Sequence, residues 1–325
     1  MPRTLAMIKT ITSNRSNLTR GYAIAVASAA ILSTTAIFIR HLTQTYRMPA
    51  LVLAFWRDGL VALTLLAVLS ALWPALLRGI YPHLRYLVAY GFVLASFNGL
   101  WVLSVALNGA AISTVLVYSS AAFTTFLGWW LLNERLNWAR CIVIAFSMGG
   151  CILVSQASDI AAWRANPLGI LTGVLSGLGY AVYSLMGRSA SQRGLNPWTT
   201  LFYTFSFATL FLLLFNLLPG GHLPGAAACP ADLFWLGDAL AGWGILSLLA
   251  AGPTVVGFGL YNVSLSYLPS GVANLILTLE PVFTTVLAYF LFGERLNGVQ
   301  LSGSLMILAG VVLLRIHEGR LGDAS

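Results

Sequence analysis

Two stretches of this chain decide its fold: residues 123–137, FTTFLGWWLLNERLN, and residues 283–297, FTTVLAYFLFGERLN. They are identical at nine of fifteen positions when the sequence is shifted by 160 residues. Further aligned pairs at that shift are Ser104 with Ser264 and Gly150 with Gly310, and at a shift of 148 they are Gly21 with Gly169, Arg40 with Arg188 and Pro49 with Pro197. The sequence therefore contains an internal duplication, and the twelve-residue difference between the shifts fits an insertion in the second half.

The composition indicates that lipid, rather than water, surrounds the duplicated unit. Of the 325 residues, 58% are hydrophobic and only 8% are charged, whereas a soluble domain has about 25% charged residues. A net charge of +8 can favour nucleic acid, but that function needs a clustered basic face. The arginines here stand singly between apolar runs, so we expect no nucleic-acid partner.

Apolar runs of about 20 residues are long enough to cross the bilayer as helices. Ten are predicted, near residues 21–40, 50–72, 85–107, 111–132, 138–156, 168–187, 198–218, 238–262, 270–292 and 298–315. The predicted fold class is an all-α polytopic membrane protein built from two five-helix repeats. Its predicted parts are a tail (1–19), a first repeat (20–156), a linker (157–166), a second repeat (167–315, with an outer loop at 219–237) and a second tail (316–325).

Lysine and arginine bias predicts that both termini lie in the cytoplasm. With that orientation, twelve basic residues lie on the inner side and four on the outer side. The inner ones are Arg3, Lys9, Arg15, Arg20, Arg78, Arg85, Arg135, Arg140, Arg188, Arg193, Arg315 and Arg320, and the outer ones are Arg40, Arg47, Arg164 and Arg295. Because five is an odd number of spans, the two repeats have opposite orientations. Glu134-Arg135 is then predicted to face the cytoplasm and Glu294-Arg295 the exterior.

The two helices that end in Glu-Arg-Leu-Asn, with Leu279-Glu280-Pro281 at the start of the ninth span, resemble the EamA-type branch of the drug/metabolite transporter superfamily. The resemblance covers roughly residues 20–315 and extends to the YddG-type aromatic amino acid exporters. It implies ten helices, export of amino acids or other metabolites, and a central cavity lined by spans 1, 3, 4, 6, 8 and 9. The first half differs at Ala121, where the family often has proline, and Ser119-Ser120 stand in for the Glu-Pro context of the second half.

Three ionisable residues are predicted inside spans: Arg57, Asp58 and Glu280. A charge at that depth costs about 2.5–3.5 kcal/mol even on insertion scales, so it should face protein or a water-filled cavity. Arg57 and Glu280 both fall near the middle of the bilayer, which makes a pair between them sterically possible. Asp58 points about 100° away from Arg57 on a helix and could meet another neighbour. The alternative is that these charges only fix helix packing.

Two prolines are predicted to bend spans and so to take part in gating, Pro281 and Pro253. Proline has no N–H, so Pro281 leaves the carbonyl of Leu277 without its helical partner. A freed carbonyl beside the Glu280 carboxyl is tolerated only where a cavity or partner satisfies both groups. Our hypothesis from sequence is that Glu280 senses a proton or the solute.

Aromatic and amide side chains within the spans complete the predicted solute site. The candidates are Trp101, Tyr118, Tyr180, Tyr183, Tyr261, Asn98, Asn262, Asn274 and Thr278. A cavity bordered by such groups suits an amphipathic or aromatic solute, because buried tyrosine hydroxyls need polar partners. For each residue the alternative is core packing or the aromatic belt at the membrane interface.

The function predicted from sequence is a secondary transporter, most simply an exporter, driven by protons or by the solute gradient alone. Two alternatives are a channel without coupled transport and a membrane-embedded enzyme. No Walker A loop and no HExxH motif is present in the sequence, and we expect neither a cofactor nor a metal site. The expected partners are the lipid bilayer, a small-molecule solute and, if transport is coupled, protons. The expected state is a monomer or weak dimer in a bacterial inner membrane.

Overall fold

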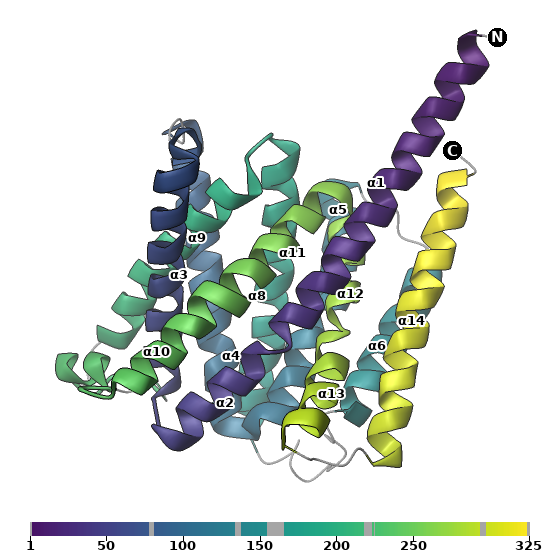
Figure 1. Cartoon of the computed structure of the whole chain (residues 1–325). Helices are drawn as coiled ribbons and strands as arrows, with labels where there is room; N and C mark the ends of the chain where they lie inside the picture. The colour runs from purple at the N-terminus through teal and green to yellow at the C-terminus, as the bar shows by residue number, and fades with distance from the viewer. Residues whose placement is uncertain are drawn as a thin grey trace.

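The computed structural model describes residues 2–77, 81–133, 138–154, 166–217, 223, 225–292 and 297–323, and over these residues it contains helices and no strands (Figure 1). Nine of the described helical segments are long and apolar enough to cross a membrane, and Trp138–Val154 is a shorter apolar helix. Together they provide the ten spans of the predicted fold. The Glu134-Arg135 and Glu294-Arg295 turns, most of the linker and part of the 219–237 loop lie outside the described residues.

The first half consists of α1 (Pro2–Leu32), α2 (Thr35–Thr45), α3 (Ala50–Leu72), α4 (Leu84–Tyr118), α5 (Ser120–Leu132) and α6 (Trp138–Val154). The second half consists of α8 (Pro167–Gln192), α9 (Pro197–Leu217), α10 (Leu240–Leu249), the π-turn η5 (Ala250–Thr254), α11 (Val255–Tyr267), α12 (Ser270–Leu277), α13 (Glu280–Phe292) and α14 (Gly298–Asp323). Short 3₁₀ turns, η1 (Pro74–Leu77), η2 (Tyr81–His83) and η4 (Pro230–Phe234), lie in the connections. Helix α1 begins at Pro2 and α14 ends at Asp323, so helical structure extends into both predicted tails.

Helix α4 contains two spans, because its chain turns back on itself. The hydroxyls of Ser104 and Ser113 lie 2.9 Å apart, whereas nine residues of straight helix would separate them by about 13 Å. The reversal falls where the sequence predicts the break between the third and fourth spans. The structure describes one helical segment from Leu84 to Tyr118, so α4 covers both spans.

Three spans are interrupted, each for a local reason. Between α1 and α2 the hydroxyls of Ser33 and Thr34 bond back to the carbonyls of Ala30 and Ile31 at 2.6 and 2.7 Å, a bond type that bends helices. In η5, Pro253 offers no N–H to the Leu249 carbonyl. The hydroxyl of Thr254 donates to that carbonyl instead, at 2.9 Å.

The ninth span is interrupted just before Pro281. The backbone N–H groups of Thr278 and Leu279 bond to carbonyls three residues earlier, at 3.2 and 3.1 Å, and α13 then restarts at Glu280. The proline cannot extend the hydrogen-bond ladder of α12. The chain therefore places a helix start, carrying a carboxyl group, in the interior of the bundle.

Matching contacts show that the two halves are related by a two-fold axis. The Ser28 hydroxyl of α1 donates to the Gly257 carbonyl of α11 at 2.8 Å, and the Ser176 hydroxyl of α8 donates to the Phe97 carbonyl of α4 at 3.1 Å. Ser28 aligns with Ser176 at the shift of 148, and Phe97 aligns with Gly257 at the shift of 160. One hydrogen bond is thus the symmetry counterpart of the other, as expected for inverted repeats.

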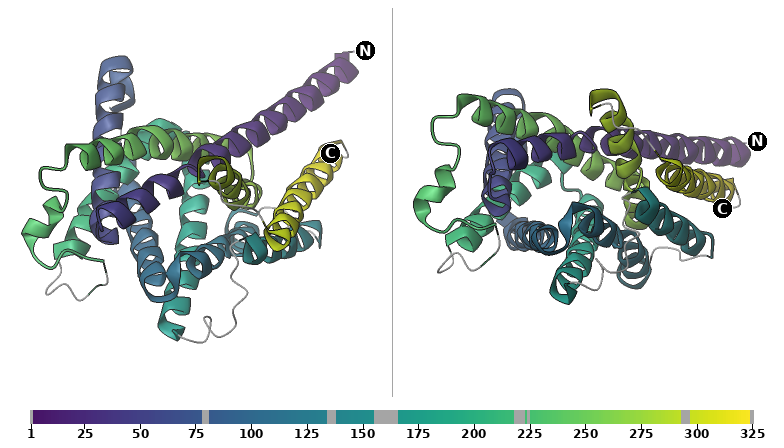
Figure 2. Two further views of the ribbon diagram at one scale, coloured as in Figure 1. Left: turned by 60° about the horizontal axis from the view of Figure 1, so that its bottom comes forward. Right: turned by 90° about the horizontal axis from the view of Figure 1, so that it is seen from below.

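The closing helices of the two repeats, α6 and α14, pack against each other at one edge of the bundle (Figure 2). A Cβ added to Gly303 would lie 2.6 Å from the Cβ of Leu153 and 2.7 Å from the carbonyl of Gly150. Glycine at both positions therefore allows the backbones to approach closely, as in other membrane helix pairs.

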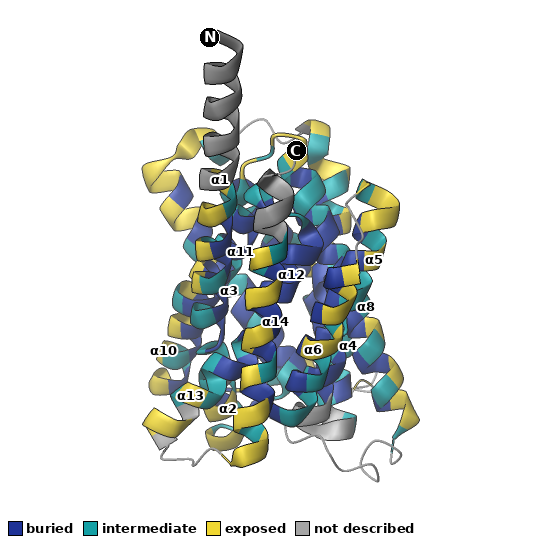
Figure 3. Ribbon diagram, turned by 90° about the vertical axis from the view of Figure 1, so that its right-hand side faces the viewer, coloured by how far each residue is buried: buried dark blue, intermediate teal, exposed yellow. Residues whose placement is uncertain are grey.

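Buried residues line the inward faces of the helices and exposed residues cover the outer surface (Figure 3). Many of the exposed side chains are large and apolar, such as Trp130, Leu210 and Phe290. An outer surface of this kind is suited to hydrocarbon. The N-terminal end of α1 and the C-terminal end of α14 lie at the same end of the bundle (Figure 1). This end is here called the terminal end.

Candidate functional site

A central cavity of about 360 Å³ lies between the two repeats. Seven of the residues predicted from sequence line it: Arg57, Asn98, Trp101, Tyr118, Tyr180, Glu280 and Pro281. The other lining residues are Leu32, Ile39, Phe97, Thr114, Val117, Val154, Phe258, Thr284 and Thr285. They belong to α1, α2, α3, α4, α6, α8, α11 and α13, so spans 2 and 5 contribute beyond the set that the family resemblance implies.

The cavity lies toward the end of the bundle opposite the terminal end, here called the distal end. Successive spans alternate in direction, so the fourth span begins and the fifth span ends at the distal end. Thr114 lies at the beginning of the fourth span and Val154 at the end of α6. Thr284 and Thr285 follow Glu280 along α13 in the same direction.

Arg57 and Asp58 form an ion pair on α3 at the cavity wall. Arg57 Nε donates to Asp58 Oδ1 at 2.9 Å, and Arg57 Nη2 lies 2.9 Å from the same oxygen. Asn98 donates to Asp58 Oδ2 at 3.3 Å. Arg57 therefore pairs with its neighbour along the chain, and not with Glu280 as the sequence made possible; the flexible arginine side chain folds back over the helix surface to reach it.

Asp58 is completely buried and does not line the cavity. Its two oxygens accept hydrogen bonds from Arg57 and Asn98, so its charge is compensated within the protein. Breaking such a pair on one side leaves an uncompensated buried charge, which is strongly destabilising. Asp58 is placed to hold the Arg57 guanidinium, rather than to contact a solute.

Glu280 enters the cavity from the opposite repeat. It is the first residue of α13, is partly exposed to the cavity and lies within hydrogen-bonding reach of the Tyr118 hydroxyl. A carboxyl group at this depth is tolerated because it borders a cavity and has a tyrosine partner.

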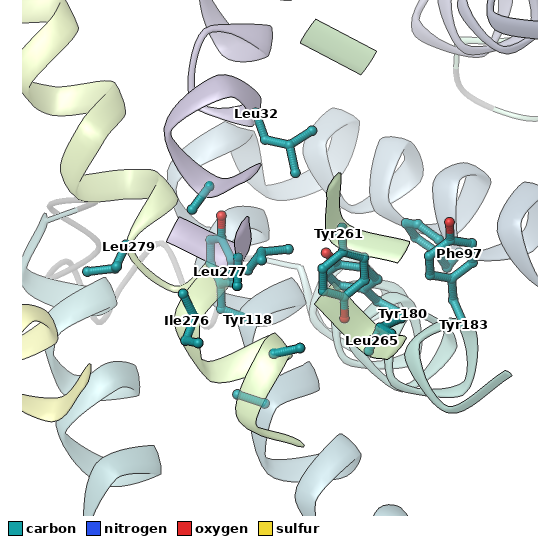
Figure 4. Packing of buried hydrophobic residues seen from close by; sticks show 14 of the residues in the cluster. Leu32, Phe97, Tyr118, Tyr180, Tyr183, Tyr261, Leu265, Ile276, Leu277 and Leu279 are labelled. Carbon is teal, nitrogen blue, oxygen red and sulfur yellow. The ribbon is translucent and has the colours of Figure 1, made fainter. Parts of the chain in front are cut away.

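Aromatic rings form part of the cavity wall, among them Phe97 and Tyr180. Phe97 stacks on Tyr180 with ring centroids 5.2 Å apart, and Tyr180 lies 6.1 Å from Tyr261. Figure 4 shows Phe97, Tyr180, Tyr183 and Tyr261 gathered together, with Tyr118 beside Leu277. The site thus combines a flat apolar wall with a few polar groups, the usual make-up of a small-molecule pocket.

Four further predicted residues, Tyr183, Tyr261, Asn262 and Asn274, lie between the cavity and the terminal end, in a hydrogen-bonded polar layer. The polar layer consists of Tyr90, Ser120, Tyr183, Ser184, Tyr261, Asn262 and Asn274, all of them buried. Ser120 donates to Asn274 at 3.0 Å and Asn274 donates to Ser184 at 3.2 Å. Ser184 and Tyr261 share a bond of 2.6 Å, Asn262 donates to Tyr183 at 3.1 Å and Tyr90 donates to Asn262 at 3.4 Å.

Internal symmetry relates the polar layer to the cavity. At the shift of 160, Glu280 is the counterpart of Ser120, Thr114 of Asn274 and Trp101 of Tyr261. The first member of each pair lines the cavity and the second belongs to the packed layer. Equivalent surfaces of the repeats are therefore separated at the distal end and in contact at the terminal end.

Besides Asp58, two predicted residues lie outside both the cavity lining and the polar layer. Thr278 bonds to the Leu275 carbonyl at 2.6 Å and to Ser147 of α6 at 3.3 Å, and Pro253 lies within η5. Sequence reasoning did not single out Thr114 or Phe258 as site residues. Thr284 and Thr285 belong to the repeated Phe-Thr-Thr motif, but that motif was interpreted as evidence of the duplication and not of a site. Among the described residues, no group of three His, Cys, Asp or Glu is placed to hold a metal ion.

Comparison with known proteins gives one family. The model of the EamA-like transporter family matches residues 19–156 and 167–316. An uncharacterised transporter of Archaeoglobus fulgidus is 28% identical over 90% of this chain and 95% of its own length. A probable amino-acid metabolite efflux pump of Salmonella typhimurium is 28% identical over 82% of this chain and 86% of its own.

A solved crystal structure aligns with a TM-score of 0.74 over 93% of this chain and 99% of its own, at 15% identity, which supports the fold alone. The family match covers both repeats, and the relatives with printed roles are transporters. The duplicated, inverted bundle around a central cavity therefore belongs to a member of the EamA-like transporter family.

Proposed function

We propose that this protein is a secondary exporter of small amphipathic metabolites, with amino acids as the principal solutes, in a bacterial inner membrane. The observation that carries the proposal is the central cavity between the repeats, which borders Arg57 and Glu280 at the depth of the bilayer interior. A volume of about 360 Å³ lies at the lower end of the range for small-ligand sites, about 300–1,000 Å³. The Salmonella relative, a probable amino-acid metabolite efflux pump, supports the solute class.

The proposed mechanism is alternating access by exchange of conformation between the repeats. Inverted-repeat carriers expose one central site to each side of the membrane in turn. In the opposite state the distal surfaces would pack as the terminal ones do in this structure. Glu280 would then approach Thr114, as Ser120 approaches Asn274 here at 3.0 Å, and the polar layer would separate.

In this proposal both termini lie in the cytoplasm, so the cavity of the present structure faces the exterior and corresponds to solute release. Glu280 is the one charged residue among these symmetry-related pairs, and its counterpart, Ser120, has no charge. A carboxylate that must enter a packed layer when the distal end closes needs a proton or a solute cation as its partner. Protonation of Glu280, or binding of a solute cation to it, is therefore required before the cavity can close.

Counterflow in proteoliposomes tests the function. Purified protein in vesicles preloaded with an amino acid should accelerate uptake of the same labelled amino acid, and the rate should saturate. Glu280→Gln should slow exchange and change its dependence on pH, whereas Asp238→Asn, in an exposed loop position, should leave both unchanged. Solute flux that neither saturates nor accelerates on exchange would indicate a channel, and an unchanged pH profile in Glu280→Gln would remove this residue from coupling.

A further inference from the structure

The Arg57 guanidinium has hydrogen-bonding capacity that the protein does not use. Its hydrogen bond runs from Nε to Asp58, and Nη2 lies beside the same oxygen without an aligned acceptor. The residue is 7% exposed and what remains accessible borders the cavity. A buried donor without an aligned acceptor is unfavourable. An acceptor group of a solute in the cavity would satisfy the remaining N–H groups of this guanidinium.

Asp58 and Asn98 keep the guanidinium in place. The pair Arg57–Asp58 holds one edge of the guanidinium, and Asn98 holds the second oxygen of Asp58. A guanidinium fixed in this way presents its remaining N–H groups in a planar fork, the geometry that matches a carboxylate. The site at Arg57 is therefore prepared for a planar anionic group.

Glu280 provides the opposite charge within the same cavity. Its carboxyl group lies by Tyr118, and the rings of Tyr118, Tyr180 and Trp101 line the cavity with it. A carboxylate next to aromatic faces is suited to an ammonium group, which gains both an ion pair and a cation–π contact. One small cavity thus borders two groups with complementary preferences, Arg57 for a carboxylate and Glu280 for an ammonium group.

We propose that the cavity binds zwitterions, with the solute carboxylate on Arg57 and its ammonium group on Glu280. The inference rests on the proposed transport function and specifies its substrate class. A solute with only one charge leaves either the remaining N–H groups of Arg57 or the Glu280 carboxylate without a solute partner, and a site built to hydrogen-bond a group rejects analogues that lack it. Simple amines and simple carboxylates are therefore excluded by the same site that accepts amino acids.

Two matched series of solutes test the charge requirement in the wild-type protein. The first is phenylalanine, phenethylamine and 3-phenylpropionate, and the second is leucine, isoamylamine and 4-methylpentanoate. In proteoliposome counterflow we expect saturable exchange of each zwitterion, with an apparent affinity at least ten-fold higher than that of either analogue in its series. Equal affinity for an amine or acid, or failure of both zwitterions to exchange, overturns the proposal.

Variants then assign each charge to its residue. Arg57→Gln should reduce affinity for the zwitterion at least ten-fold and leave affinity for the amine within about two-fold. Glu280→Gln should reduce affinity for the zwitterion at least ten-fold and leave affinity for the acid within about two-fold. Arg40→Gln, in the separate groove between α2 and α10, is the matched control and should behave as wild type. Loss of amine and zwitterion affinity together in Arg57→Gln would overturn the assignment.

The outcomes separate the two levels of the argument. If Arg57→Gln does not yield folded protein, Arg57→Lys keeps the charge but loses the fork, and it should weaken zwitterion affinity while sparing the amine. Saturable exchange of single-charge solutes would leave the carrier function intact and refute the two-charge site. Absence of exchange for every solute in both series and in a wider amino acid panel would refute the proposed function itself.

Discussion

The polar layer offers the sharpest test of alternating access, through Asn274. This side chain accepts a hydrogen bond from Ser120 of α5 at 3.0 Å and donates one to Ser184 of α8 at 3.2 Å. Interhelical hydrogen bonds in membranes contribute about 0.6 kcal/mol each, so Asn274→Leu should weaken closure of the terminal end by about 1.2 kcal/mol. That change raises the population of the state open at this end about eight-fold.

A cysteine at Thr125 reports the opening. Thr125 is buried at the contact of α5 with Gly271 of α12, and its counterpart at the shift of 160, Thr285, lines the cavity. A Thr125→Cys reporter, in a protein whose three native cysteines are replaced, should react with a water-soluble thiol reagent only when the terminal end opens. Asn274→Leu should raise the modification rate about eight-fold.

The same substitution elsewhere provides the control. Asn216 is also buried and makes three hydrogen bonds, to Leu51, Leu212 and Ala227, outside the polar layer. Asn216→Leu should lower thermal stability without a comparable rise in modification of the Thr125→Cys reporter. A rate for Asn274→Leu within two-fold of the parent, or an equal rise with Asn216→Leu, would refute the role of the layer as a gate.

Three further predictions follow from other contacts. Asp58→Asn should lower the melting temperature in detergent, because it leaves the Arg57 charge unpaired at a cost of up to about 3–5 kcal/mol. The double variant with Arg57→Gln should recover part of this loss of stability. Additive losses from the two substitutions would contradict the pairing. Gly303→Ala should destabilise the protein by about 1–3 kcal/mol, since its Cβ would overlap Leu153, whereas Ser302→Ala on the exposed face should be neutral in the same melt. In a protein whose other cysteines are replaced, exposed Cys229 should react with a membrane-impermeant maleimide from outside the cell; labelling only after the cells are opened would reverse the predicted orientation.

The candidate site was only partly predictable from the sequence. Arg57 and Glu280 stood out because charges are rare inside apolar spans, and both line the cavity. The pairing of Arg57 with Asp58 was not predicted, because adjacent residues diverge by about 100° on a helix and only side-chain flexibility brings them together. Asn262 and Asn274, like Asn98, are amide side chains within apolar spans, yet of the three only Asn98 lines the cavity.

The sequence alone determined the solvent, the span count and the inverted duplication of this protein. Those properties depend on summed hydropathy, on the bilayer thickness and on the parity of five spans, none of which needs knowledge of side-chain contacts. Only the tertiary structure decided toward which end of the bundle the cavity lies and which polar residues form the packed layer. Glu280 and Ser120 occupy equivalent places in the repeats, and the difference between their surroundings comes from how the two halves pack.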